Sequence, residues 1–152
     1  MAGTDFIGSR SDDSLIMNRV LLVSNEMAGL TSRLWDALEA DRLEVRWCPG
    51  PQAPTYVCAG GRNETCALPC RSDIVVLDCF LDSDIKGRGT SSRQLLDYYV
   101  RNDLPVVALV DLDEPPLAPS SRNVVTLPRD ADPEEISKAV VCFTDAVARR
   151  AS

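Results

Sequence analysis

Residues 73–78 read DIVVLD, an apolar run between two aspartates that predicts a buried central strand. A continuously apolar strand is typical of the centre of a parallel sheet, where helices cover both faces. Residues 19–23 (RVLLV) and 105–110 (PVVALV) have the same character. Residues 43–47 (LEVRW) alternate apolar and polar side chains, as a more exposed strand does. Residues 123–127 (NVVTL) complete a set of five predicted strands.

Amphipathic segments stand between some of these strands. Leu30, Leu34 and Leu38 recur at helical spacing and predict a helix of about three turns. Thr90 and Ser91 can cap a second helix that ends near Asn102. A third helix begins at Asp132 and Pro133, which form a strong start signal, and runs to about Arg149. These helices place the chain in the α/β class.

Alternating strands and helices predict a doubly wound, five-stranded parallel sheet in the order 2-1-3-4-5. Residues 49–72 and 111–122 are rich in turn-forming residues, so we expect loops to reduce or replace the second and fourth crossover helices. Residues 79–89 read as an acidic, turn-rich loop. We expect residues 1–18 to form a flexible tail and residues 19–150 to form one domain with a cysteine-rich insertion at 49–72.

Length and charge narrow the classes of function. A chain of 152 residues holds one sizeable core. No apolar run approaches the ~20 residues of a membrane span, and no export signal is visible, so we expect a cytoplasmic protein without membrane contact. A net charge of −7 argues against nucleic-acid binding. No output domain is visible, so we expect the partner to be another protein chain or a second copy.

The chain contains no histidine, which excludes histidine-based acid–base catalysis, Ser-His-Asp or Cys-His nucleophile pairs and histidine metal sites. Gly60 and Gly61 lack the strand-to-helix context of a phosphate-binding loop. No other nucleophile–base pair is visible in the sequence. We therefore expect that the protein is not an enzyme.

Over about residues 19–149 the chain resembles a bacterial response-regulator receiver domain. The resemblance is carried by residues 20–26 (VLLVSNE), 73–78, 104–110 (LPVVALV) and 124–135 (VVTLPRDADPEE). It implies a signal-transduction role in a phosphorelay. In such domains an aspartate after the third strand accepts a phosphoryl group beside a Mg²⁺ ion, which acids after the first strand help to hold. A hydroxyl after the fourth strand and a lysine after the fifth strand grip the phosphoryl oxygens.

Only part of that pattern is present here. Asp78 matches the phospho-acceptor, but Ser24 and Asn25 replace the acid pair and leave Glu26 as the nearest carboxylate. The hydroxyl position is Val110 and the lysine position is Leu127. Mg²⁺ depends on carboxylate ligands, and leucine cannot balance a phosphoryl dianion. We therefore expect a degenerate receiver, a pseudo-receiver that acts as a stand-alone adaptor, with no bound Mg²⁺.

Two other functions stay open. In the first, Asp82, Asp84 and Asp111 rebuild an acidic site and Asp78 is phosphorylated. The other interpretation of these three aspartates is that they are solvated loop acids. In the second, the receiver scaffold carries a metal-responsive or thiol-redox module.

The metal hypothesis rests on Cys48, Cys58, Cys66 and Cys70, four of the six cysteines. Only Cys66 and Cys70 have the short spacing of a zinc knuckle, so zinc, an iron–sulfur cluster, redox-active thiols and free thiols all stay open. We expect Cys58, Cys66 and Cys70 to share one ligand cluster, with Cys48 or Cys79 as a fourth member. The reason is that a segment poor in apolar residues needs a cross-link to become ordered.

The helix near residue 98 suggests a partner surface. Tyr98, Tyr99 and Val100 are consecutive, and helical positions turn by ~100° each, so all three cannot face the core. We expect at least one of the two tyrosines on the outer surface, where tyrosine favours protein interfaces.

Overall fold

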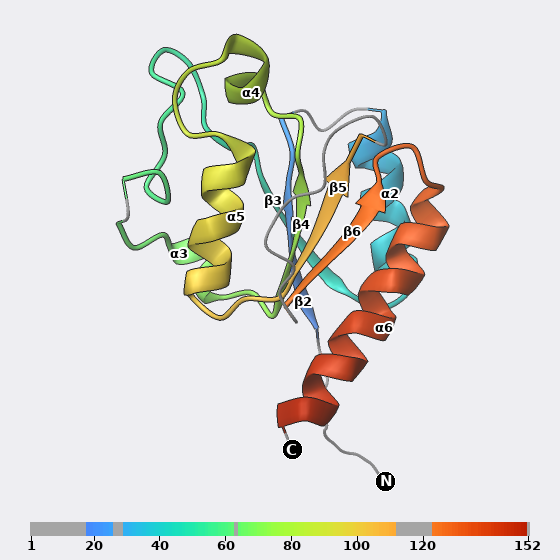
Figure 1. Cartoon of the computed structure of the whole chain (residues 1–152). Coiled ribbons are helices and arrows are strands. Elements are labelled where there is room, and N and C mark those ends of the chain that lie inside the picture. Colours follow the sequence, from blue (N-terminus) through green and yellow to red (C-terminus); the bar gives the residue numbers. More distant parts are fainter. Residues whose placement is uncertain (1–17, 26–28, 63, 112–122, 152) are drawn as a thin grey trace, which may run out of the picture.

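The computed structural model describes residues 18–25, 29–62, 64–111 and 123–151. Five parallel strands form one sheet in the order β3-β2-β4-β5-β6 (Figure 1). The bounds are β2 Arg19–Val23, β3 Glu44–Cys48, β4 Ile74–Asp78, β5 Val106–Val110 and β6 Val124–Pro128. Numbered by their place among the five, this is the predicted order 2-1-3-4-5, so the expected α/β fold is confirmed. Residues 1–17 of the predicted tail at 1–18, and residues 112–122 of the predicted loop at 111–122, lie outside the described residues.

Helices cover both faces of the sheet. Their bounds are α2 Leu30–Ala40, α3 Ala67–Cys70, α4 Asp82–Lys86, α5 Ser92–Arg101 and α6 Pro133–Ala151. Helices α2 and α6 pack together on one face, and α5 lies on the other (Figure 1). None of the helices in the described part of the chain is long and apolar enough to cross a membrane.

Side-chain alternation along the strands divides the core into two layers. Val20, Leu22, Ile74 and Val76 belong to the layer beneath α2 and α6, and the residues between them belong to the layer beneath α5. β4 lies between β2 and β5, and its first four residues are fully buried. This explains why its sequence is continuously apolar.

Two short helices lie in the turn-rich segments: α3 agrees with the expected reduction of the second crossover helix, whereas α4 was not expected. α3 is a four-residue turn within the cysteine-rich segment. α4 occupies part of residues 79–89, which the sequence predicted as a loop, and Gly87 ends it in the left-handed conformation at φ 66°. Gly87 suits that conformation because it has no Cβ. The predicted cap of α5 is confirmed, since the Ser91 hydroxyl accepts from the Gln94 N–H at 3.1 Å.

The expectation of an exposed tyrosine on α5 is wrong. Tyr98 and Tyr99 are only 6% and 3% exposed, and their rings meet edge to face with centroids 5.8 Å apart. The Tyr98 hydroxyl donates to the Glu64 carbonyl and accepts from the Cys66 N–H. The cysteine-rich segment therefore covers the side of α5 that helical geometry alone would leave in solvent.

Candidate functional site

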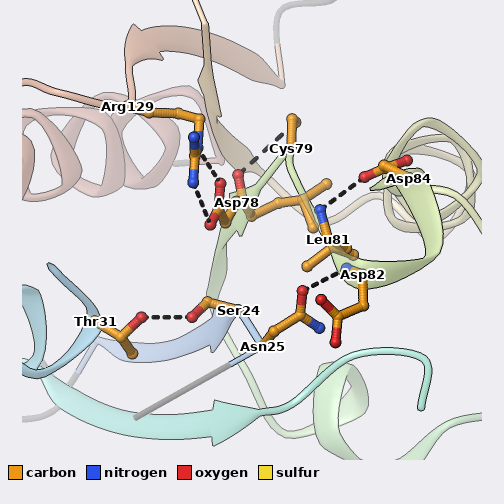
Figure 2. A network of polar contacts seen from close by, with 10 residues as sticks. Ser24, Asn25, Thr31, Asp78, Cys79, Leu81, Asp82, Asp84 and Arg129 are labelled. Carbon is orange, nitrogen blue, oxygen red and sulfur yellow. Dashed lines mark hydrogen bonds and ion pairs between the residues drawn. The ribbon is translucent and has the colours of Figure 1, made fainter. Parts of the chain in front are cut away.

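The functional positions implied by the sequence meet at the carboxyl end of the sheet. Asp78 is the last residue of β4, and Ser24 directly follows β2 (Figure 2). Val110 ends β5 and lies opposite Pro128 in the register of β6. Glu26 lies outside the described residues. Carboxyl ends of parallel strands are where open α/β sheets place their ligand sites, so this end is the candidate site.

Arg129 occupies the centre of this site, and the sequence reasoning missed it. Its Nε donates to Asp78 Oδ1 at 2.6 Å and its Nη2 donates to Asp78 Oδ2 at 3.2 Å, a bidentate ion pair (Figure 2). The two side chains are only 27% and 16% exposed. The guanidinium carbon also lies 4.7 Å from the centroid of the Phe80 ring. Such forked, charge-assisted pairs are among the stronger polar contacts in proteins.

Strand geometry explains why Arg129, and not the residue at the expected lysine position, reaches Asp78. Leu127 packs against the core beneath α2 and α6. Side chains two residues apart project from the same face of a strand, so Arg129 points to that face just beyond the end of β6. β5 lies between β4 and β6, which separates their backbones by about 10 Å. A long arginine side chain spans that gap. A basic residue two positions after Leu127 was the signal in the sequence.

The residues at the acid-pair position are neutral and already engaged. The Ser24 hydroxyl is hydrogen-bonded to the Thr31 hydroxyl inside the protein. The Asn25 Oδ1 accepts from the Asp82 N–H, and its Nδ2 donates to the Pro49 carbonyl at 3.0 Å. Asn25 thereby ties three segments together, which is a structural role.

The three acids that could rebuild a metal site differ in their availability. Asp84 accepts from the Leu81 N–H at 2.9 Å and from the Ser92 N–H at 3.0 Å, so each of its carboxylate oxygens is hydrogen-bonded to a backbone N–H. Asp82 and Asp111 are exposed. The alternative of a rebuilt acidic site is therefore left with two exposed carboxylates, and Asp84 serves to fix α4 and the start of α5.

Burial controls the titration of this site. Burial raises the pKa of Asp78, and the hydrogen bond and charge of Arg129 oppose that rise without cancelling it. The same pair raises the pKa of Arg129. Burial, followed by the charges of Asp78 and Asp84, raises the pKa of Cys79 to about 12. At neutral pH Cys79 is therefore a neutral thiol.

Comparison of the chain with known protein-family models gives no match. Comparison with curated proteins gives none either.

The cysteines lie apart from this ion pair, except for Cys79. All six are free thiols. Cys58 and Cys66 each help to raise the pKa of Cys48, after its burial, so these three thiols lie within electrostatic range of one another. Cys70 is exposed and lines a small cavity with Tyr98.

Within the described residues, no group of three or more cysteine, aspartate or glutamate side chains is arranged to hold a metal ion. The zinc assignment stays a prediction.

Thiol reactivity offers a direct check of these environments. We expect iodoacetamide at about pH 7.5 to alkylate the exposed Cys70 and Cys142 first. Cys79 should react about a thousandfold more slowly than an ordinary thiol, because a pKa of about 12 leaves almost no thiolate. Peptide mass spectrometry over time gives the rate at each cysteine, with urea-unfolded protein as the control. Equal rates at Cys79 and Cys70 in the folded protein would contradict the described burial.

Proposed function

We propose that this chain is a receiver-like adaptor, a protein-interaction domain in signal transduction that is not phosphorylated by the Mg²⁺-dependent route. The observation that carries the proposal is the bidentate pair between Asp78 and Arg129. The proposal includes no catalytic activity of the chain's own.

The ion pair removes the nucleophile that phosphorylation needs. An attacking carboxylate must aim a free oxygen at phosphorus while a metal ion neutralises the developing charge. Here both oxygens of Asp78 accept from one guanidinium. Breaking the pair would leave two charged groups in a largely buried place without partners, which costs several kcal/mol.

The metal side of the site is equally unfavourable. Mg²⁺ in proteins is held by carboxylates together with water. Ser24 and Asn25 carry no charge and already have hydrogen-bond partners within the protein. Asp84 is committed to two backbone N–H groups. The contacts thus favour a stable, closed arrangement over a reactive centre.

The fold supports the proposal without deciding it. The sheet order matches what the resemblance to receiver domains implies, but the same α/β architecture hosts many unrelated functions. The replaced site residues and the ion pair are therefore what support an adaptor.

Phosphoryl transfer tests the proposal. We expect no phosphoryl adduct on Asp78 after incubation with acetyl phosphate and Mg²⁺, measured by intact mass, with Asp78→Asn as the control for labelling elsewhere. Beryllofluoride with Mg²⁺ should leave the NMR signals of Ser24 and Asn25 unshifted, because Arg129 fills the place of the added group. Stoichiometric labelling that Asp78→Asn abolishes would overturn the proposal and support an active phospho-receiver.

A further inference from the structure

Exposed apolar side chains gather at the end of the molecule that holds the Asp78–Arg129 pair. Val57, Phe80 and Ile85 are 37%, 43% and 56% exposed, and they are the large apolar side chains found exposed in the described part of the chain. Phe80 follows β4 closely, and Ile85 lies on α4, which stands beyond the carboxyl ends of the strands (Figure 1). Val57 lies in a stretch hydrogen-bonded to residues 88–90. The three side chains therefore share one end of the fold.

The segment that presents Phe80 and Ile85 is firmly held. Leu81, between them, is fully buried. Asp84 accepts from the Leu81 N–H, and Asn25 accepts from the Asp82 N–H (Figure 2). The exposed residues are thus displayed by a fixed backbone, which lowers the entropy that a partner must overcome on binding.

The Asp78–Arg129 pair contributes to the same display. The Arg129 guanidinium lies against the Phe80 ring at 4.7 Å from its centroid, while Asp78 holds its nitrogens. A cation against an aromatic face is a favourable contact. The residue that resembles a phospho-acceptor therefore acts, through Arg129, as a positioning residue for an exposed aromatic side chain.

The exposed charges at this end are mainly negative. Asp82 lies on α4, Asp111 follows β5 and Asp130 follows β6, and all three are exposed. Of the neighbouring bases, Lys86 and Arg88 are exposed as well, and Arg88 also donates to the Pro54 carbonyl. The whole chain carries a net charge of −7. Such a field attracts cationic partners and disfavours anionic ones.

We propose that this end of the molecule docks a partner-protein segment that combines apolar side chains with lysine or arginine. Phe80 and Ile85 contact the apolar side chains, and the exposed aspartates pair with the basic ones. We call Val57, Phe80, Ile85 and the three exposed aspartates the Phe80–Ile85 surface. The inference rests on the proposed adaptor function and adds the surface and the chemistry of its partner.

The test uses the whole chain and two synthetic amphipathic helical peptides, one of leucine and arginine and one of leucine and glutamate. In NMR titrations at about 150 mM salt, we expect the basic peptide to shift the signals of residues 80–86 and Val57. The acidic peptide should bind at least about tenfold more weakly. The double variant Phe80→Ser, Ile85→Ser should also lose about tenfold in affinity for the basic peptide while keeping every charge.

Three outcomes would overturn the inference. The double variant could bind the basic peptide as the unchanged chain does, which would show charge attraction alone. The shifts could fall elsewhere, such as on the groove between α2 and α6 that Asp36 and Lys138 line. The same residues could shift when the chain alone is concentrated, which would identify a second copy as the occupant. Phosphoryl labelling of Asp78 is measured separately, so failure of the adaptor proposal would be distinguishable from failure of this surface.

Discussion

Replacing Arg129 with glutamine should lower the free energy of unfolding by about 2 kcal/mol at neutral pH. The variant leaves the ionised Asp78, which is only 16% exposed, without its charged partner. An unpaired, largely buried charge costs more than the pair itself contributes, so a loss of this size is expected. Urea unfolding followed by circular dichroism measures it. Arg129→Lys keeps the charge but loses the bidentate hydrogen bonding, and it should lower the free energy of unfolding by less.

The loss should shrink as the pH falls. In the unchanged chain, burial places the pKa of Asp78 above its usual value of 3.8, despite Arg129. Without Arg129 the pKa rises further, because the hydrogen bond and the positive charge that lowered it are gone. A carboxyl with a raised folded pKa binds its proton more tightly when folded, so its ionisation destabilises the fold as pH rises through that pKa. The deficit of the variant should therefore be larger at about pH 7.5 than at about pH 4.5.

A matched control separates this effect from a general loss of positive charge. Arg93 lies exposed on α5, and Arg93→Gln removes the same charge from the surface. Exposed charges of this kind contribute little to stability. If Arg129→Gln and Arg93→Gln unfold at the same urea concentration at both pH values, the ion pair does not stabilise the fold.

The strands were predictable because their signal is local. β2 and β4 have the residues and bounds that their apolar runs indicated, and the cap of α5 lies within four residues of chain. α4 was missed because its formation depends on contacts from distant parts of the chain. Its first residue, Asp82, donates its N–H to the Asn25 amide oxygen, which lies 57 residues earlier in the chain. A helix this short carries too little periodicity to be recognised alone.

For a similar reason, the position of Asp78 could be predicted from the sequence, but its pairing with Arg129 could not. Asp78 stands at the end of a recognisable strand, so its place at the sheet edge followed from the pattern. The pairing with Arg129 depends on β5 lying between β4 and β6 and on the direction of the side chains that follow β6. Those facts belong to the assembled sheet. The receiver pattern points to Leu127, at the expected lysine position, and not to Arg129, which lies two residues later on the same face.

The cysteine-rich segment has contacts with α5 that the sequence did not predict, and the expected metal cross-link stays a prediction beside them. It was expected to need a metal cross-link, because it contains few apolar residues. The structure holds it against residues 88–98 with ordinary contacts. Thr90 donates its N–H to the Tyr56 carbonyl at 2.7 Å and accepts from the Cys58 N–H, while Gly60 lies buried beside the Tyr98 ring. These contacts explain both the order of the segment and the burial of the tyrosines on α5.

Gly61→Ala should release this segment while the sheet stays folded. A Cβ at Gly61 would lie 1.8 Å from Thr90 Oγ1 and 2.7 Å from Thr90 Cβ. Thr90 cannot yield easily, because its N–H is bonded to Tyr56 and its side chain is buried. Trypsin should therefore cut after the exposed Arg62 about tenfold faster in the variant, since cleavage requires local opening. Intact mass measures the rate, and circular dichroism checks that the fold remains.

Two further variants identify what holds the segment. Gln52→Ala changes an exposed residue of the same stretch and should be cut as slowly as the unchanged chain. If the contacts with α5 alone hold the segment, Cys66→Ser should be cut as slowly as Gln52→Ala, because the contact of Cys66 with Tyr98 uses its backbone N–H. If Cys66→Ser is instead cut as fast as Gly61→Ala, a thiol cross-link and not the contacts with α5 holds the segment. Elemental analysis of the unchanged protein would then distinguish a bound metal from a disulfide, because a metal cross-link requires a stoichiometric ion.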